Sequence, residues 1–83
     1  MRLNITTPAQ VGEIVRARRK ALKLSQAELA TRLGISQSRL SVVEQSPETL
    51  TLERLIALAN VLGLSLVLQD KPGREPKTSD AAW

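Results

Sequence analysis

The chain has 83 residues with no Cys and no His, and its 12 basic and 8 acidic side chains give a net charge of +4 at pH 7. This length allows one small domain with a marginal core, so we expect an oligomer. The missing residue types exclude disulfides, thiolate or imidazole metal sites and histidine-dependent catalysis, and we expect no metal or other cofactor. No apolar run approaches the roughly 18 residues of a membrane span, and the first residues lack the apolar stretch of a secretory signal. We therefore expect a cytoplasmic protein without a membrane partner, associated with the nucleoid if it binds DNA.

Basic residues concentrate in one part of the chain. Residues 16–39 hold seven basic side chains against one acidic, whereas residues 40–70 hold four acidic against one basic. A concentrated basic patch attracts phosphate backbones and gives an affinity that falls with salt. An ordinary solvated helix surface is the alternative, but the motif within the same stretch favours DNA.

The first predicted helix spans residues 8–22. Thr7 suits its N-cap and, with Gln10, makes a capping box. Arg19 interrupts the apolar stripe of this helix, and a buried unpaired charge is costly. Glu44 is the expected partner in a structural ion pair, and the alternative is that Arg19 reaches water. The stripe itself consists of Val11, Ile14, Val15 and Leu22.

Two further helices, predicted over residues 26–33 and 37–45, meet at a tight turn. Ser25 opens the first with a Ser-x-x-Glu capping box, Gly34 ends it, and Ser36 suits the N-cap of the second. This is the helix-turn-helix pattern, which predicts a sequence-specific DNA-binding protein. The apolar residues on the shared face are Leu29, Leu33, Ile35, Leu40 and Val43.

The second helix of this motif is expected in the major groove, with its first residues at the base edges. Gln37 is the best candidate because its amide can bond bidentately to adenine. Arg39 can reach a guanine or a phosphate, and Gln26 stands at a helix N-terminus, where free N–H groups favour phosphate. The predicted base-reading residues are Ser36, Gln37, Ser38, Arg39 and Ser41, and the predicted phosphate contacts are Lys23, Ser25, Gln26 and Arg32.

A fourth helix is predicted over residues 52–62, after a break at Ser46-Pro47 and before Gly63. Its expected core-facing stripe is flanked by two more apolar residues, Leu58 and Val61, which indicates a second buried side against another chain. The stripe consists of Leu52, Leu55, Ile56, Ala59 and Leu62.

Residues 64–69 alternate between apolar and other side chains, which predicts a strand. A lone strand leaves both edges unpaired, so we expect it to pair with the same strand of a second copy across a two-fold axis. A short fifth helix is the alternative. The predicted dimerisation residues are Leu58, Val61, Leu64, Leu66 and Leu68.

Residues 71–83 form a polar, Pro- and Gly-containing tail that we expect to be flexible, after a DNA-binding and dimerisation domain at residues 1–70. The only aromatic side chain of the protein, Trp83, stands at its end. Because Trp is a preferred anchor at interfaces, Trp83 could dock in a partner. Two alternatives have equal weight: Trp83 has no role at this position, or it packs loosely on the protein's own surface.

Residues 8–68 resemble the Cro/CI-type helix-turn-helix family, also called the XRE family. The resemblance implies an all-α, lambda-repressor-like domain of four or five helices, to which the short C-terminal strand predicted above is added, pairing across a homodimer. It also implies that Gln37, Ser38 and Ser41 face DNA bases and that Gln26 binds a phosphate. It further implies an ion pair between Arg19 and Glu44. The motifs that carry it are Ser25-Gln26-x-Glu28-Leu29-Ala30, Leu33-Gly34-Ile35, Ser36-Gln37-Ser38-x-Leu40-Ser41 and Leu55-x-x-Leu58-Ala59-x-x-Leu62-Gly63-Leu64.

Within this family the chain is similar to HipB-type antitoxins of toxin–antitoxin modules. The strand directly after the fourth helix, the polar tail and the terminal Trp83 carry the similarity. It implies a homodimeric repressor that binds a palindromic double-stranded operator in its own operon. It further implies a HipA-type serine/threonine kinase toxin as partner, with a pocket that takes Trp83.

Two other functions remain open. One is a stand-alone phage-like or restriction-controller transcriptional regulator without a toxin partner. The other is a protein-interaction adaptor that no longer binds DNA, against which the basic patch and the polar third helix argue. An enzyme with a small-molecule substrate is not expected, because one short chain without Cys, His or a Gly-rich phosphate loop has little room for a catalytic pocket.

Overall fold

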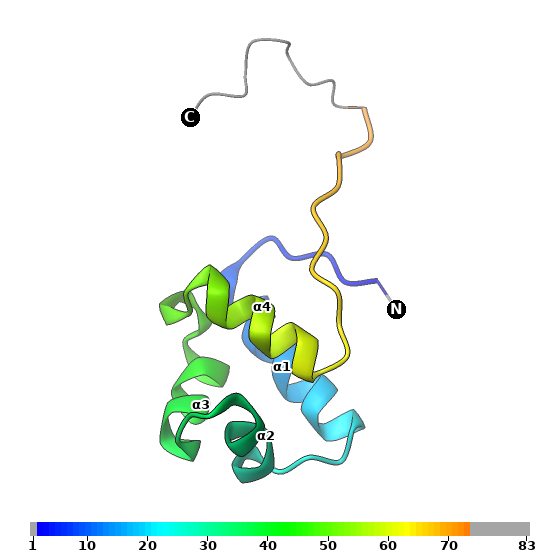
Figure 1. Ribbon diagram of the computed structural model, residues 1–83. Coiled ribbons are helices and arrows are strands. Elements are labelled where there is room, and N and C mark those ends of the chain that lie inside the picture. The colour runs from blue at the N-terminus through cyan, green and yellow to red at the C-terminus, as the bar shows by residue number, and fades with distance from the viewer. Residues whose placement is uncertain (1, 74–83) are drawn as a thin grey trace.

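Four α-helices and one short 3-10 helix make up the regular structure of residues 2–73, which are the residues that the computed structural model describes. The helices pack around one apolar core, with α2 and α3 at one end of the molecule (Figure 1). This confirms the predicted all-α, helix-turn-helix fold. The elements are α1 (Pro8–Ala21), α2 (Gln26–Leu33), α3 (Gln37–Gln45), η1 (Pro47–Thr49) and α4 (Leu52–Val61).

Polar caps explain where the helices begin. The hydroxyls of Ser25, Ser36 and Thr51 each accept a backbone N–H three residues along the chain, at 3.0, 3.1 and 3.1 Å. Glu28 completes the capping box of α2 by accepting the N–H of Ser25 at 2.9 Å. Gly34 ends α2 with φ 70°, a conformation that costs glycine little. The predicted bounds of α2 and α3 are therefore confirmed, while α1 and α4 end one residue earlier than predicted.

The face that α4 turns inward agrees only in part with the predicted one, because Leu62 of the predicted stripe is buried but Leu52 and Ile56 are not. Leu58 and Leu62 are each 1% exposed, whereas Leu52 is 67% and Ile56 44% exposed. Leu58 thus packs in the core of its own chain, and its prediction as a dimerisation residue was wrong. Apolar residues surround most of α4, so periodicity alone could not choose the inward face; packing against α2 does. The buried core consists of Val15, Leu29, Ala30, Leu40, Val43, Leu58 and Leu62.

The two chain segments outside the helices lie next to each other. Residues 64–70 leave α4 after Gly63 and cross the extended residues 2–6 (Figure 1). The guanidinium of Arg2 donates a hydrogen bond to the Gln69 side chain there. Residues 64–70 form no helix, which removes the fifth-helix alternative, and strand pairing with a second copy stays a prediction.

The predictions for Trp83 and for most of the tail concern residues outside the described range. Among the residues that are described, no helix is long and apolar enough to cross a membrane.

Gly12 marks the closest approach between α1 and the end of α3. A Cβ at this position would lie 2.3 Å from the carbonyl oxygen of Glu44 and 3.4 Å from Cδ of Pro47. Only a residue without a side chain lets the two backbones come this near. The sequence pattern did not single out this glycine.

We therefore predict that Gly12→Ala destabilises the protein by about 1–3 kcal/mol, the usual cost of overpacking a filled interior. At a solvent-exposed position of a helix, the same substitution would stabilise the protein, because alanine has the higher helix propensity. Urea unfolding measures the change, with the exposed neighbour Glu13→Ala as control. A more stable Gly12→Ala variant would contradict the close contact.

Candidate nucleic-acid interface

A buried ion pair joins α1 to α3. The Arg19 guanidinium donates from Nε to Oε2 of Glu44 at 2.8 Å and from Nη2 to Oε1 at 3.3 Å. Its Nη1 donates to the backbone carbonyl of Leu24 at 3.0 Å. Arg19 and Glu44 are only 9% and 4% exposed. The charge that interrupts the apolar stripe of α1 is thus paired, in the forked geometry that arginine forms with carboxylates.

The same carboxylate also takes a donor from α2. Nε2 of Gln26 lies 3.1 Å from Oε1 of Glu44. Arg16 adds a longer ion pair, with Nε 3.8 Å from Oε1, and its Nη2 donates to the backbone carbonyl of Glu44 at 3.4 Å. One amide hydrogen of Gln26 is therefore committed to Glu44, and its second hydrogen and its oxygen remain available. The structure fixes the orientation of the side chain that was predicted to hold a phosphate.

These partners keep Glu44 charged. Burial raises the pKa of the Glu44 carboxyl, but hydrogen bonds from Arg19 and Gln26 and the charges of Arg19 and Arg16 together outweigh it and leave the pKa below its ordinary value of 4.5. The pKa of Glu28 is also lowered, by its capping hydrogen bonds with Ser25. A charged Glu44 is what holds α1, α2 and α3 together at this point.

Polar side chains cover the outward face at the start of α3. Gln37, Ser38 and Arg39 are exposed and Ser41 is half-buried. The hydroxyl of Ser36 accepts the N–H of Arg39 as a cap, which leaves its own hydrogen free to donate. The structure therefore places all five predicted base-reading residues on or beside one accessible helix end.

Val42 belongs to the same outward face but was missed by the sequence analysis. It is 52% exposed, one helical turn after Ser38. A branched apolar side chain at this position can contact the methyl group of a thymine. The sequence could have indicated this, because residue 42 lies on a different side of the helix from the core positions Leu40 and Val43.

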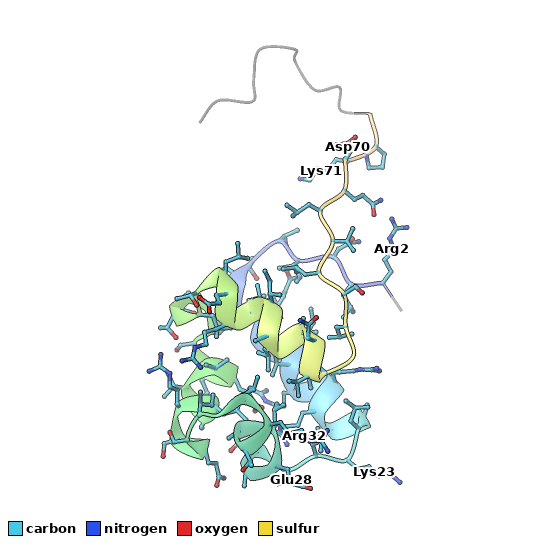
Figure 2. All side chains as sticks on the ribbon, in the orientation of Figure 1. Arg2, Lys23, Glu28, Arg32, Asp70 and Lys71 are labelled. Atoms are coloured by element: carbon cyan, nitrogen blue, oxygen red, sulfur yellow. The ribbon has the colours of Figure 1, made fainter. Side chains whose placement is uncertain are left out.

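The predicted phosphate contacts lie around α2 at one end of the molecule. Figure 2 shows Lys23 projecting from the turn between α1 and α2, with Arg32 and Glu28 on α2 nearby. Lys23 has φ 58°, a left-handed conformation that costs a non-glycine residue free energy. The Ser25 hydroxyl accepts a capping bond and can still donate. Within residues 2–73, no cluster of three or more His, Cys, Asp and Glu side chains could hold a metal ion.

Comparisons with known proteins agree with this geometry. A family model described as helix-turn-helix matches residues 15–69. Antitoxin HipB of Escherichia coli (strain K12) is 29% identical over 76 residues, which cover 92% of this chain and 86% of that protein. A solved HipB–O1–O2 complex matches with TM-score 0.75 and 30% identity, over 83% of this chain and 100% of the matched chain. A HipA–HipB–O2–O3 complex matches with TM-score 0.74 and 30% identity, over 83% of this chain and 97% of the matched chain.

The Glu44 carboxylate with its partners Arg16, Arg19 and Gln26, called the Glu44 cluster, leads to a prediction about acid stability. The pKa of Glu44 is lower in the folded state than its unfolded-state value of 4.5. The stabilisation that the charged carboxylate contributes is therefore fully present above pH 4.5 and is lost as the pH falls through the folded-state pKa. Glu44→Gln should therefore cost about 3 kcal/mol at pH 7, and the gap to the parent protein should shrink below pH 4.5.

Urea unfolding at several pH values measures both effects. Glu28→Gln is the matched control, since it removes an exposed carboxylate whose pKa is also lowered, and it should cost far less. A constant gap between parent and Glu44→Gln from pH 7 to pH 3 would contradict the assignment.

Proposed function

The chain belongs to the helix-turn-helix family, and from this premise we propose that it is a sequence-specific repressor that acts as the antitoxin of a toxin–antitoxin module. In this proposal it binds the operator of its own operon and a HipA-type serine/threonine kinase toxin. The observation that carries the DNA-binding part is the exposed polar face of α3, held in place by the buried Glu44 cluster.

Sequence recognition would come from the first two turns of α3. Gln37 can bond to N6 and N7 of an adenine, and Val42 can pack on a thymine methyl group. Ser38 and Ser41 are short and bond either class of base, while Arg39 reaches a guanine or a flanking phosphate. Ser36, at the N-cap, has a hydroxyl hydrogen to donate at the same edge.

Phosphate contacts would come from α2 and the turn before it. Gln26 is already oriented by Glu44 and presents its second amide hydrogen at the N-terminus of α2, where the helix dipole favours anions. Lys23 and Arg32 add positive charge on the same side (Figure 2). The left-handed backbone of Lys23 would cost less free energy with glycine, which supports a role for the lysine side chain. Ser25 completes the set with its free hydroxyl hydrogen.

Two copies would bind a palindromic operator. Leu66 and Leu68 are 44% and 98% exposed in the single chain, and Val61 and Leu64 are half-buried against the core. Pairing residues 64–69 across a two-fold axis would cover these side chains and satisfy one open strand edge. Half-sites should then lie about 10 bp apart, or a multiple of that spacing.

Similarity to HipB over 92% of the chain supports the toxin part of the proposal, as does the match to a complex that contains HipA. Trp83 would anchor the tail in the kinase. Co-purification from the native operon, followed by mass analysis, tests this directly, with deletion of Trp83 as the comparison. A kinase that copurifies only with the intact chain is expected. Operator binding without any kinase would instead identify a stand-alone transcriptional regulator.

Base reading is tested with Gln37→Ala. We predict a loss of about 1–3 kcal/mol in operator binding and loss of discrimination at one base pair in each half-site. Binding to operators with each base pair changed in turn measures both quantities. Gln45→Ala, at the far end of α3, is the control, and equal effects of the two variants would contradict the assignment.

Phosphate binding is tested with Arg32→Gln. Each phosphate contact changes the slope of log K against log[salt] by about 0.9, so a dimer should lose nearly two units of slope, with little change in sequence preference. Lys71→Gln removes the same charge at the opposite end of the molecule (Figure 2) and should leave the slope unchanged. An unchanged slope for Arg32→Gln would exclude Arg32 from the phosphate contacts.

A further inference from the structure

Residues 2–6, called here the N-terminal arm, are extended chain that lies against the protein without joining its core. Leu3 and Ile5 are 46% and 45% exposed, whereas Leu68, also in extended chain, is 98% exposed. About half of the surface of Leu3 and of Ile5 is therefore already covered. The arm crosses residues 64–70 in Figure 1.

Hydrogen bonds fix the arm at both ends. Arg2 donates to the side chain of Gln69, 67 positions away along the chain. At the other end, Oε1 of Gln10 accepts the N–H groups of Thr6 and Thr7 at 2.6 and 3.0 Å. An extended segment held in this way has little conformational entropy left to lose if it joins a sheet.

We propose that the N-terminal arm is the outer strand of the dimerisation sheet and pairs antiparallel with residues 64–69 of its own chain. This inference rests on the proposed dimer, in which the other edge of residues 64–69 pairs with the second copy. The complete sheet would have four strands, two from each chain. The arm would then cover the edge that dimerisation leaves open, which is otherwise a site for unwanted strand pairing.

The Arg2–Gln69 contact is compatible with one register in particular. In an antiparallel pair of strands, residue numbers rise along one strand where they fall along the other. If Arg2 stands opposite Gln69, Leu3 would face Leu68, which is 98% exposed in the single chain, and the next apolar pair would follow two residues along each strand. Directly opposed side chains lie on the same face of the sheet, so this register gathers apolar residues on one face.

The residue types favour this register over the two that differ from it by one residue. Ile5 falls opposite Leu66 on the apolar face, and Thr6 falls opposite Ser65 on the face that carries Arg2 and Gln69. A slip of one residue would place Leu3 opposite Val67 or Gln69 and mix the two faces. The apolar face so formed is the one that a second copy would cover.

The single chain does not show this pairing, for a physical reason. Among residues 2–73 no strand is formed, and the arm and residues 64–70 share one side-chain hydrogen bond as they cross. A two-stranded ribbon is marginal in water, while three or more strands with an apolar face are stable. Dimerisation supplies the missing strands, so backbone pairing of the arm and of the dimer strand should form together.

Cysteine cross-linking tests the register, because the chain has no natural cysteine. Leu3→Cys with Leu68→Cys should form a disulfide within one chain. Leu3→Cys with Val67→Cys is the control, since it moves one thiol to the other face. We expect the first pair to oxidise at least ~10-fold faster in the dimer, because disulfides need Cβ atoms about 3.5–4.5 Å apart. Non-reducing electrophoresis separates disulfides within a chain from disulfides between chains.

A second measurement avoids cysteines. Leu3→Ser with Ile5→Ser should weaken dimerisation roughly tenfold in analytical ultracentrifugation, as expected for lost apolar cover, while Asn4→Ser, on the other face of the arm, should not. Equal oxidation of the two cysteine pairs, cross-links mainly between chains, or an unchanged dimer constant for Leu3→Ser with Ile5→Ser would overturn the arm's role. A parent chain that sediments as a monomer with operator DNA would overturn the proposed dimer itself.

Discussion

The buried carboxylate of Glu44 is the interaction on which the arrangement of the first three helices depends. It takes hydrogen bonds from Arg19 on α1 and Gln26 on α2, while Glu44 itself stands on α3. Removing one partner of a buried pair leaves an uncompensated charge, which is far more costly than losing a surface ion pair. The relative positions of α1, α2 and α3 are therefore set by one charged group inside an otherwise small apolar core.

The backbone at Glu44 constrains the fold as closely as its side chain. Gly12 brings α1 so near the Glu44 carbonyl oxygen that no Cβ fits, and Arg16 donates to the same oxygen. Close backbone packing and the ion pair thus meet at the end of the helix that we propose to enter the major groove. In that proposal the start of α3 contacts bases, while its end is held to α1 by the Arg19–Glu44 ion pair. Gln26 hydrogen-bonds Glu44 and would also bind a DNA phosphate.

Local signals were enough to predict part of this structure. The caps at Ser25 and Ser36 gave the first residues of α2 and α3, because a cap depends on residues within one turn. The partner of Arg19 could be inferred from the cost of burying a charge. The inward face of α4, the need for Gly12 and the exposure of Val42 depend on how helices pack, which residue spacing does not specify. Strand formation by residues 64–69 depends on a second chain.

A double-mutant cycle on operator binding tests most directly whether the Glu44 cluster serves DNA recognition. The four proteins are the parent, Gln26→Ala, Glu44→Gln and the double variant, each measured where it is fully folded. If Glu44 acts on DNA by orienting Gln26, then Glu44→Gln should weaken binding in the parent background and cost nothing further once residue 26 is alanine. Additive losses would show that Glu44 acts through the position of α3 and not through Gln26, and an unchanged operator affinity for Glu44→Gln in the parent background would contradict the account.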